Sequence, residues 1–186
     1  MAKEIEIKFA VEDEEKMAEK LLSSGARKVF EGLEHNVVFD NGQLHKSGML
    51  LRLRKTSDGK SVLTFKKGVR KAEFKEAEEI ETGVSDFKEA KKILTGLGYK
   101  IFWIYEKQKS VFSLGNAEVS LDRLPFGTFI EIEGAKPEIR KAITKLGLDP
   151  KKGNTQSYLG LYKKYCKDKG IRMDNLVFWK KARPTL

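Results

Sequence analysis

Apolar and charged residues alternate along much of this chain. Residues 3–11 place Ile5 and Ile7 on one side and Glu4 and Glu6 on the other, which is the two-residue period of a β-strand with unlike faces. The same period predicts further strands over residues 27–40, 48–56, 60–67, 73–83, 99–114, 117–123 and 127–134.

Other segments have the apolar spacing of an α-helix. They are residues 12–24, 86–97, 137–146 and 155–168. The first helix is expected to bury Met17, Leu21 and Leu22 and to end at Gly25, a plausible C-terminal cap. Ser85 is expected to be the N-cap of the second helix.

Nearly every predicted strand has one apolar face and one face with ionisable groups. An open antiparallel sheet with its charged face in water would give the same pattern. The charges are sorted, however, with acids in some strands and Arg or Lys in others, whereas a solvated face gains most from mixing them. A long sheet with helices on its apolar face can curl until its ionic face lies inside a barrel. We therefore expect a single α+β domain, an antiparallel closed barrel of roughly eight strands with flanking helices.

The charged strand faces carry the candidate chemistry. Their acidic residues are Glu4, Glu6, Glu79, Glu81, Asp122, Glu131 and Glu133. Their basic residues are Lys8, Arg52, Arg54, Lys66, Lys107 and Lys109. Paired carboxylates without His or Cys partners are hard oxygen ligands suited to Mg²⁺ or Mn²⁺, and Arg and Lys side chains bind phosphate oxygens. Together they suit a polyphosphate and support phosphoryl or nucleotidyl transfer without a covalent nucleophile.

Composition narrows the range of binding partners and of cellular compartments for such a site. The net charge of +10 favours polyanionic partners, which could be nucleic acid, a membrane surface or a phosphorylated small molecule. No apolar run approaches the roughly 20 residues that cross a bilayer, and the N-terminus does not look like an export signal. The single cysteine, Cys166, excludes an internal disulfide framework. His35 and His45 are expected at the surface, and the protein is expected in the cytoplasm and away from membranes.

Several of these motifs occur in an order that resembles one family. They are Glu4-x-Glu6-x-Lys8, LRLR at 51–54, LTFK at 63–66, EEIE at 78–81 and LDRLPFGTFIEIEG at 121–134. The series is similar to that of the CYTH family, also called the triphosphate tunnel metalloenzymes, which includes class IV adenylate cyclases, thiamine triphosphatases and inorganic triphosphatases. Residues 1–165 are therefore expected to form a tunnel domain. Residues 166–186 are expected to dock on that domain or to make a subunit contact in a homodimer.

The resemblance implies roles for the charged residues. Glu4, Glu6 and Lys8 would be catalytic. The divalent metal would be held by Glu4, Glu6, Glu131 and Glu133, with Glu79, Glu81 and Asp122 completing or tuning that side. The triphosphate would be bound by Lys8, Arg52, Arg54, Lys66, Lys107 and Lys109.

The family resemblance leaves three functions open. Triphosphate hydrolysis is favoured, with an inorganic or organic substrate, because it needs the fewest features absent from the sequence. A class IV adenylate cyclase that converts ATP to cyclic AMP and pyrophosphate is the alternative. A module that binds polyphosphate or, less expectedly, nucleic acid without catalysis is a third. Departures from the family pattern leave the substrate open: Lys109 stands where many relatives have arginine, and Asn36 and Val38 where relatives often have an acid and a tyrosine.

Overall fold

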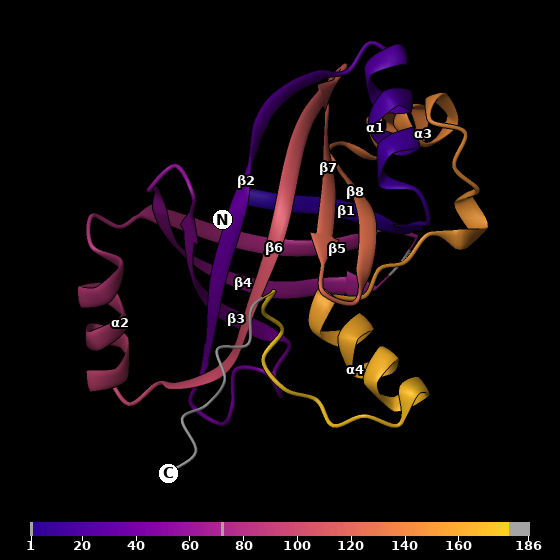
Figure 1. Cartoon of the computed structure of the whole chain (residues 1–186). Coiled ribbons are helices and arrows are strands. Elements are labelled where there is room, and N and C mark those ends of the chain that lie inside the picture. The colour runs from indigo at the N-terminus through magenta and orange to yellow at the C-terminus, as the bar shows by residue number, and fades with distance from the viewer. Residues whose placement is uncertain (1, 72, 179–186) are drawn as a thin grey trace.

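A computed structural model describes residues 2–71 and 73–178 of the chain. The strands form a closed antiparallel barrel in the order β1-β5-β4-β3-β2-β6-β7-β8 (Figure 1). Their bounds are β1 Ala2–Val11, β2 Arg27–Asp40, β3 Met49–Thr56, β4 Ser61–Lys71, β5 Lys75–Gly83, β6 Lys100–Leu114, β7 Ala117–Leu124 and β8 Gly127–Glu133. The predicted fold class, an eight-stranded closed barrel with flanking helices, is confirmed.

The helices lie on the outside of the barrel and at one end of it (Figure 1). They are α1 Glu14–Ser23, α2 Phe87–Gly96, α3 Lys136–Lys145 and α4 Tyr158–Lys169, with a short 3-10 turn, η1 Pro150–Lys152. None of the helices in residues 2–71 and 73–178 is long and apolar enough to span a bilayer.

Two details of the predicted helices were wrong. Asp86, not Ser85, is the N-cap of α2, because its side chain accepts hydrogen bonds from the backbone N–H groups of Lys88 and Glu89. In α1, Leu21 is buried, whereas Leu22 is 54% exposed. One residue along a helix turns the side chain by about 100°, which takes Leu22 off the buried stripe.

Apolar side chains fill the space between the barrel wall and the helices. Beneath α1 and α3, Leu21 and Ile139 pack with Ile130 and Ile132 of β8. Beneath α2, Leu94 packs in a separate cluster with residues of β2 and β3. A third cluster joins the aromatic residues of α4 to Trp103 and Tyr105 at one end of the barrel.

The EEIE stretch at residues 78–81 departs from the expected pattern, in which the apolar face of each strand packs under a helix. Ile132 is fully buried beneath a helix, but Ile80 on β5 is 51% exposed. The helix α3 packs against β1, β7 and β8, and α2 against β3 and β6, so Ile80 lies outside both contact areas. The apolar face of this strand is therefore only partly covered.

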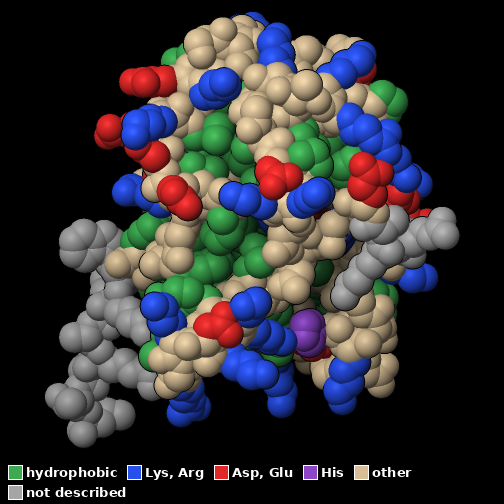
Figure 2. All heavy atoms as spheres, turned by 90° about the vertical axis from the view of Figure 1, so that its right-hand side faces the viewer, with side chains coloured by type: hydrophobic (Ala, Val, Ile, Leu, Met, Phe, Trp, Pro, Cys, Tyr) green, Lys and Arg blue, Asp and Glu red, His purple; other side chains and the backbone are tan. Residues whose placement is uncertain are grey.

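The outer surface mixes charges of both signs. Figure 2 shows Lys and Arg side chains scattered over one face of the molecule, with Asp and Glu side chains among them. Such mixing is what a solvated surface favours, and it contrasts with the sorted charges on the inner faces of the strands.

Replacing Ile132 by alanine should destabilise the chain by about 2–4 kcal/mol, because it removes buried methylene groups and leaves a cavity. The matched change Ile80→Ala should cost less than about 1 kcal/mol, because half of that side chain already contacts water. Urea denaturation of both variants measures the difference. An equal loss of unfolding free energy in the two variants would contradict the assignment of Ile132 to the core and Ile80 to the surface.

Candidate functional site

The barrel interior is lined by the polar faces of the strands. Because side chains alternate across a strand, every second residue of each strand faces inward. Acids come mainly from β1, β5 and β8, and bases from β3, β4 and β6. Closing the barrel therefore places the two kinds of side chain opposite each other.

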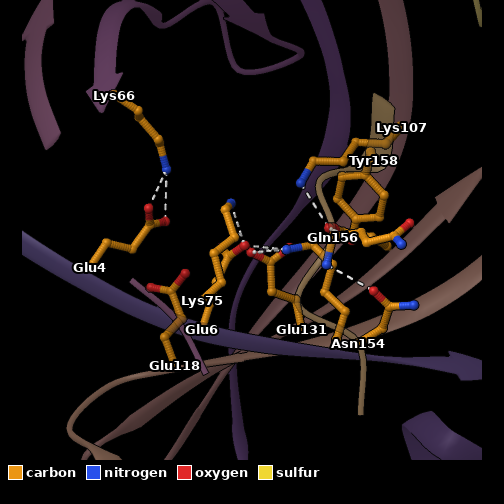
Figure 3. Close-up of polar contacts among 12 residues, drawn as sticks. Glu4, Glu6, Lys66, Lys75, Lys107, Glu118, Glu131, Asn154, Gln156 and Tyr158 are labelled. Carbon is orange, nitrogen blue, oxygen red and sulfur yellow. Dashed lines mark hydrogen bonds and ion pairs between the residues drawn. The ribbon is translucent and has the colours of Figure 1, made fainter. Parts of the chain in front are cut away.

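Carboxylates from β1 and β8 form an acidic cluster. Glu4, Glu6 and Glu131 each offer an oxygen, and these atoms lie within 4.8 Å of one another. The strand register explains their meeting, since Lys8 pairs with Glu131 and Glu6 with Glu133 across β1 and β8. Figure 3 shows Glu6 and Glu131 side by side, with Glu4 beyond them.

The acidic cluster is not fully neutralised by protein cations. Burial, followed by the charge of Glu131, raises the pKa of Glu6, although Lys8 opposes the shift. The pKa of Glu133 rises to about 7, first through burial and then through the charges of Glu4 and Glu131. A bound cation would relieve this repulsion. The cluster consists of carboxylate oxygens alone, which fits a hard divalent ion such as Mg²⁺ or Mn²⁺.

Lys8 lies between the acids of β1 and β8. Its Nζ is 3.2 Å from a carboxylate oxygen of Glu131, and it also donates a hydrogen bond to Glu6. Burial lowers the pKa of Lys8, but the carboxylates of Glu131 and Glu6 raise it to a net value above its ordinary range. The neighbouring carboxylates therefore favour the charged form of Lys8 inside the barrel.

Glu79 and Glu81 lie beside the acidic cluster and contact side chains of β3 and β4. Lys66 Nζ lies 2.7 Å from Glu4 (Figure 3). It also lies 3.1 Å from Glu79, so it links β1 to β5. Thr64 donates a 2.6 Å hydrogen bond to Glu81, which lies 3.5 Å from Arg52. The acids of β5 thus contact the cationic residues directly.

Asp122 lies apart from the three clustered glutamates. It is fully buried and accepts a 2.8 Å hydrogen bond from Lys107 and a 2.7 Å hydrogen bond from the Tyr158 hydroxyl. Its second oxygen has no hydrogen-bond partner among residues 2–71 and 73–178. The structure places Asp122 with the basic groups of β6, and its predicted part in metal binding remains a prediction.

Arginine and lysine side chains form the opposite, cationic group. Arg54 lies 3.2 Å and Lys107 3.5 Å from the carboxylate of Glu34, which is almost completely buried. Burial opposes ionisation of Glu34, but Lys107 and Arg54 lower its pKa to about 2. Lys109 contacts acid more loosely, with its Nζ 4.0 Å from Glu118.

Several interior residues were not assigned to the site by the sequence analysis. Glu34 and Asn36 alternate in β2, a signal hidden by the apolar run that follows them. Lys75, at the start of β5, lies 2.7 Å from Glu6. Tyr158 enters from α4, and its ring lies between Lys8 and Lys107, whose Nζ atoms are 5.2 and 5.4 Å from the ring centroid. No strand period could have indicated a residue that comes from a helix.

The histidines and the cysteine lie away from this interior. His35 is half-buried and lies 3.1 Å from the partly buried carboxylate of Glu106. His45 is exposed and lies 3.1 Å from the exposed Lys163. Cys166 is buried among the aromatic residues of α4.

Some buried donors of the cationic group have no acceptor. Arg52 Nε and Asn36 Nδ2 lack hydrogen-bond partners within the described part of the chain. Buried polar groups normally find partners, so these donors are suited to oxygen atoms of a bound anion. With the acidic cluster opposite, the interior can hold an anion chain and a divalent cation together.

The chain is thus a closed antiparallel barrel whose inward faces carry carboxylates on some strands and cations on others. The CYTH domain model matches residues 2–158, and the chain belongs to the CYTH family, whose members are triphosphate tunnel enzymes. Membership implies a triphosphate substrate and, typically, dependence on a metal ion.

Individual proteins are similar to this chain in sequence or fold. The candidate adenylate cyclase MJ0240 of Methanocaldococcus jannaschii is 26% identical over 141 residues, which cover 74% of this chain and 80% of that protein. The structure of PH1012 from Pyrococcus horikoshii has a TM-score of 0.75 at 29% identity, covering 85% of this chain and 98% of that one. HpAC1 of Hippeastrum, a candidate adenylyl cyclase with a dominant triphosphatase activity, shares the fold at 20% identity, with a TM-score of 0.57 over 99% of this chain and 93% of its own.

In metal-free buffer at about pH 8, Glu133→Gln should raise the unfolding temperature. The folded chain keeps the Glu133 proton up to a pKa of about 7, whereas the ordinary value is 4.5, so stability falls as pH rises through that window. Glutamine cannot ionise, so it removes the buried negative charge that causes this loss of stability. Near pH 4, where the carboxyl is protonated in both states, the variant and the wild type should differ little.

Thermal unfolding with a chelator present measures this effect, and Glu19→Gln on the exposed side of α1 is the matched control. A Glu133→Gln chain that unfolds at a lower temperature than the wild type at the higher pH would contradict a strained, uncompensated acidic cluster.

Proposed function

We propose that this chain is a divalent-metal-dependent triphosphatase. The observation that supports this most directly is the placement of three clustered glutamates opposite a group of arginines and lysines inside one closed barrel. A triphosphate needs both partners, because its oxygens carry several negative charges that protein cations and a metal ion neutralise together.

Glu4, Glu6 and Glu131 would hold the Mg²⁺ or Mn²⁺ ion, with Glu133 next to them on β8. When bound, this ion would supply Lewis-acid neutralisation of charge on the phosphate oxygens. Glu79 and Glu81 would contribute from β5. Asp122 would act indirectly, by holding Lys107 and Tyr158 in place.

The cationic residues would bind the phosphate chain. Arg52 and Arg54 offer planar guanidinium groups, which suit phosphate oxygens better than point charges do. Lys66 would exchange its carboxylate partners for phosphate, Lys107 would bind phosphate while it stays paired with Asp122, and Lys109 would add charge at the edge of the group. Lys8, between the metal ligands and Tyr158, is placed to neutralise charge at the reacting phosphate.

Hydrolysis is the reaction we favour. It requires only water as the attacking group, whereas cyclisation of ATP requires the ribose 3′-hydroxyl to be held in line with the α-phosphate. The dominant triphosphatase activity of HpAC1, a protein of the same fold, supports this order. Adenylate cyclase activity is the second candidate, because MJ0240 and HpAC1 both bear that name. We expect either reaction to take place in the cytoplasm.

Turnover assays with tripolyphosphate, ATP and thiamine triphosphate test the proposal, with Mg²⁺ or Mn²⁺ present and phosphate and cyclic AMP measured separately. We expect phosphate release. Glu6→Gln should reduce it about 100-fold or more, since even outer-shell changes at metal sites cost roughly 10–100-fold. Glu19→Gln, which alters an exposed carboxylate, is the control.

Cyclic AMP as the main product would favour the cyclase instead. Tight triphosphate binding without turnover would overturn catalysis and favour a polyphosphate-binding module. Equal activity in the Glu6→Gln variant and the wild type would contradict the proposed metal site.

A further inference from the structure

Residues 173–178 lie along an edge of β6 that β7 does not occupy. On one side β6 pairs with β2 over most of its length, and on the other β7 pairs with it only from Gln108 to Leu114. The end of the described chain fills the remaining edge, where Leu176 bridges Tyr105 in a parallel sense. Figure 1 shows this segment running from α4 back to β6.

The hydrogen bonds of this segment fall on both sides of Tyr105. Leu176 donates from its backbone N–H to the Ile104 carbonyl at 2.9 Å and accepts from the backbone N–H of Glu106 at 2.8 Å. The side-chain oxygen of Asn175 accepts from the Ile104 N–H at 3.0 Å, and the Phe178 N–H donates to the Glu106 carboxylate at 3.1 Å. The backbone of Tyr105 is therefore clamped before and after the residue.

Side-chain packing fixes the Tyr105 ring as well. Leu176 is 4% exposed and belongs to the same buried cluster as Trp103, Tyr105 and Tyr158. The rings of Trp103 and Tyr105 stack with their centroids 4.5 Å apart. Loss of the Leu176 side chain would leave this end of the cluster loosely packed.

The clamped ring points its hydroxyl at the cationic group. Arg52 Nη1 donates to the Tyr105 oxygen at 3.4 Å. Burial raises the pKa of Tyr105, but Arg52, Arg54 and Lys107 outweigh it, and the net pKa is lowered. A tyrosine hydroxyl that accepts one hydrogen bond still carries one hydrogen that it can donate. Two nearby donors, Arg52 Nε and Asn36 Nδ2, lack acceptors within residues 2–71 and 73–178. Asn36 pairs directly with Tyr105 across β2 and β6.

We propose that the Tyr105 hydroxyl donates a hydrogen bond to the bound triphosphate, and that residues 173–178, which lie beyond the matched CYTH region, position it. This inference rests on the proposed triphosphate function. Tyr105 is the residue that touches the phosphate, and Leu176 is a positioning residue that acts through it.

Calorimetric binding of tripolyphosphate in the presence of a chelator tests the first part without turnover. Tyr105→Phe keeps the ring and removes only the hydroxyl, so it should weaken binding about tenfold or more, the usual effect of losing a hydrogen bond to a charged group. Tyr99→Phe, outside the aromatic cluster, is the matched control and should bind like the wild type.

A double-mutant cycle tests the positioning role. Leu176→Ala should weaken binding about threefold in the wild-type background and cause no further loss in the Tyr105→Phe background, because coupled residues are not additive. Ile171→Ala, half exposed in the same tail, is the control. If Leu176→Ala does not fold, Asn175→Ala removes one clamp at an exposed position and serves in the same cycle.

Equal weakening by the tail variant in both backgrounds would overturn the positioning role and leave Leu176 as a packing residue only. Unchanged binding by Tyr105→Phe, with normal turnover by the wild type, would overturn this inference and leave the proposed function standing. A wild-type chain that does not bind tripolyphosphate in the presence of the chelator, and does not hydrolyse it with Mg²⁺ or Mn²⁺ added, would overturn both.

Discussion

The structure depends on neutralising charges inside a closed barrel. Removing an isolated charge from water costs several kcal/mol or more, so every buried acid or base needs a partner. The barrel provides partners by sorting: β1, β5 and β8 supply carboxylates, and β3, β4 and β6 supply cations that reach across to them. Contacts such as Lys66 with Glu4 and Lys8 with Glu131 join strands far apart in sequence. The interior can therefore stay ionic without unfolding the chain.

The same pairing makes the interior suitable for a ligand. The acidic cluster keeps Glu6 and Glu133 at raised pKa values, and Arg52 Nε in the cationic group has no acceptor in the part of the chain that the structure describes. In the proposed function a metal ion would relieve the first imbalance and phosphate oxygens the second. Because the side chains are already held by neighbouring strands, little reorganisation is needed when the ligand replaces the internal ion pairs. The same interior charges that stabilise the barrel by pairing would thus also bind the proposed ligand.

Much of this arrangement could be predicted from local patterns. The period of two is clear in β1 and β3, where charged and apolar residues alternate without interruption, and it placed Glu4, Glu6, Arg52 and Arg54 on inward faces. The pattern fails where a strand is apolar on both sides, as after Asn36, and this hid Glu34. It also cannot report contacts made by a helix or a tail, which is why Tyr158 and Leu176 were not assigned to the barrel interior or its edge. Such contacts depend on tertiary packing, which has no sequence period.

A crystal structure of the chain with Mn²⁺ and tripolyphosphate tests the central claim most directly. We expect anomalous signal from Mn²⁺ between Glu4, Glu6 and Glu131, and phosphate oxygens in contact with Arg52 and Arg54 inside the barrel. Phosphate bound only on the outer surface, with the internal ion pairs unchanged, would show that the charged interior serves the stability of the barrel alone.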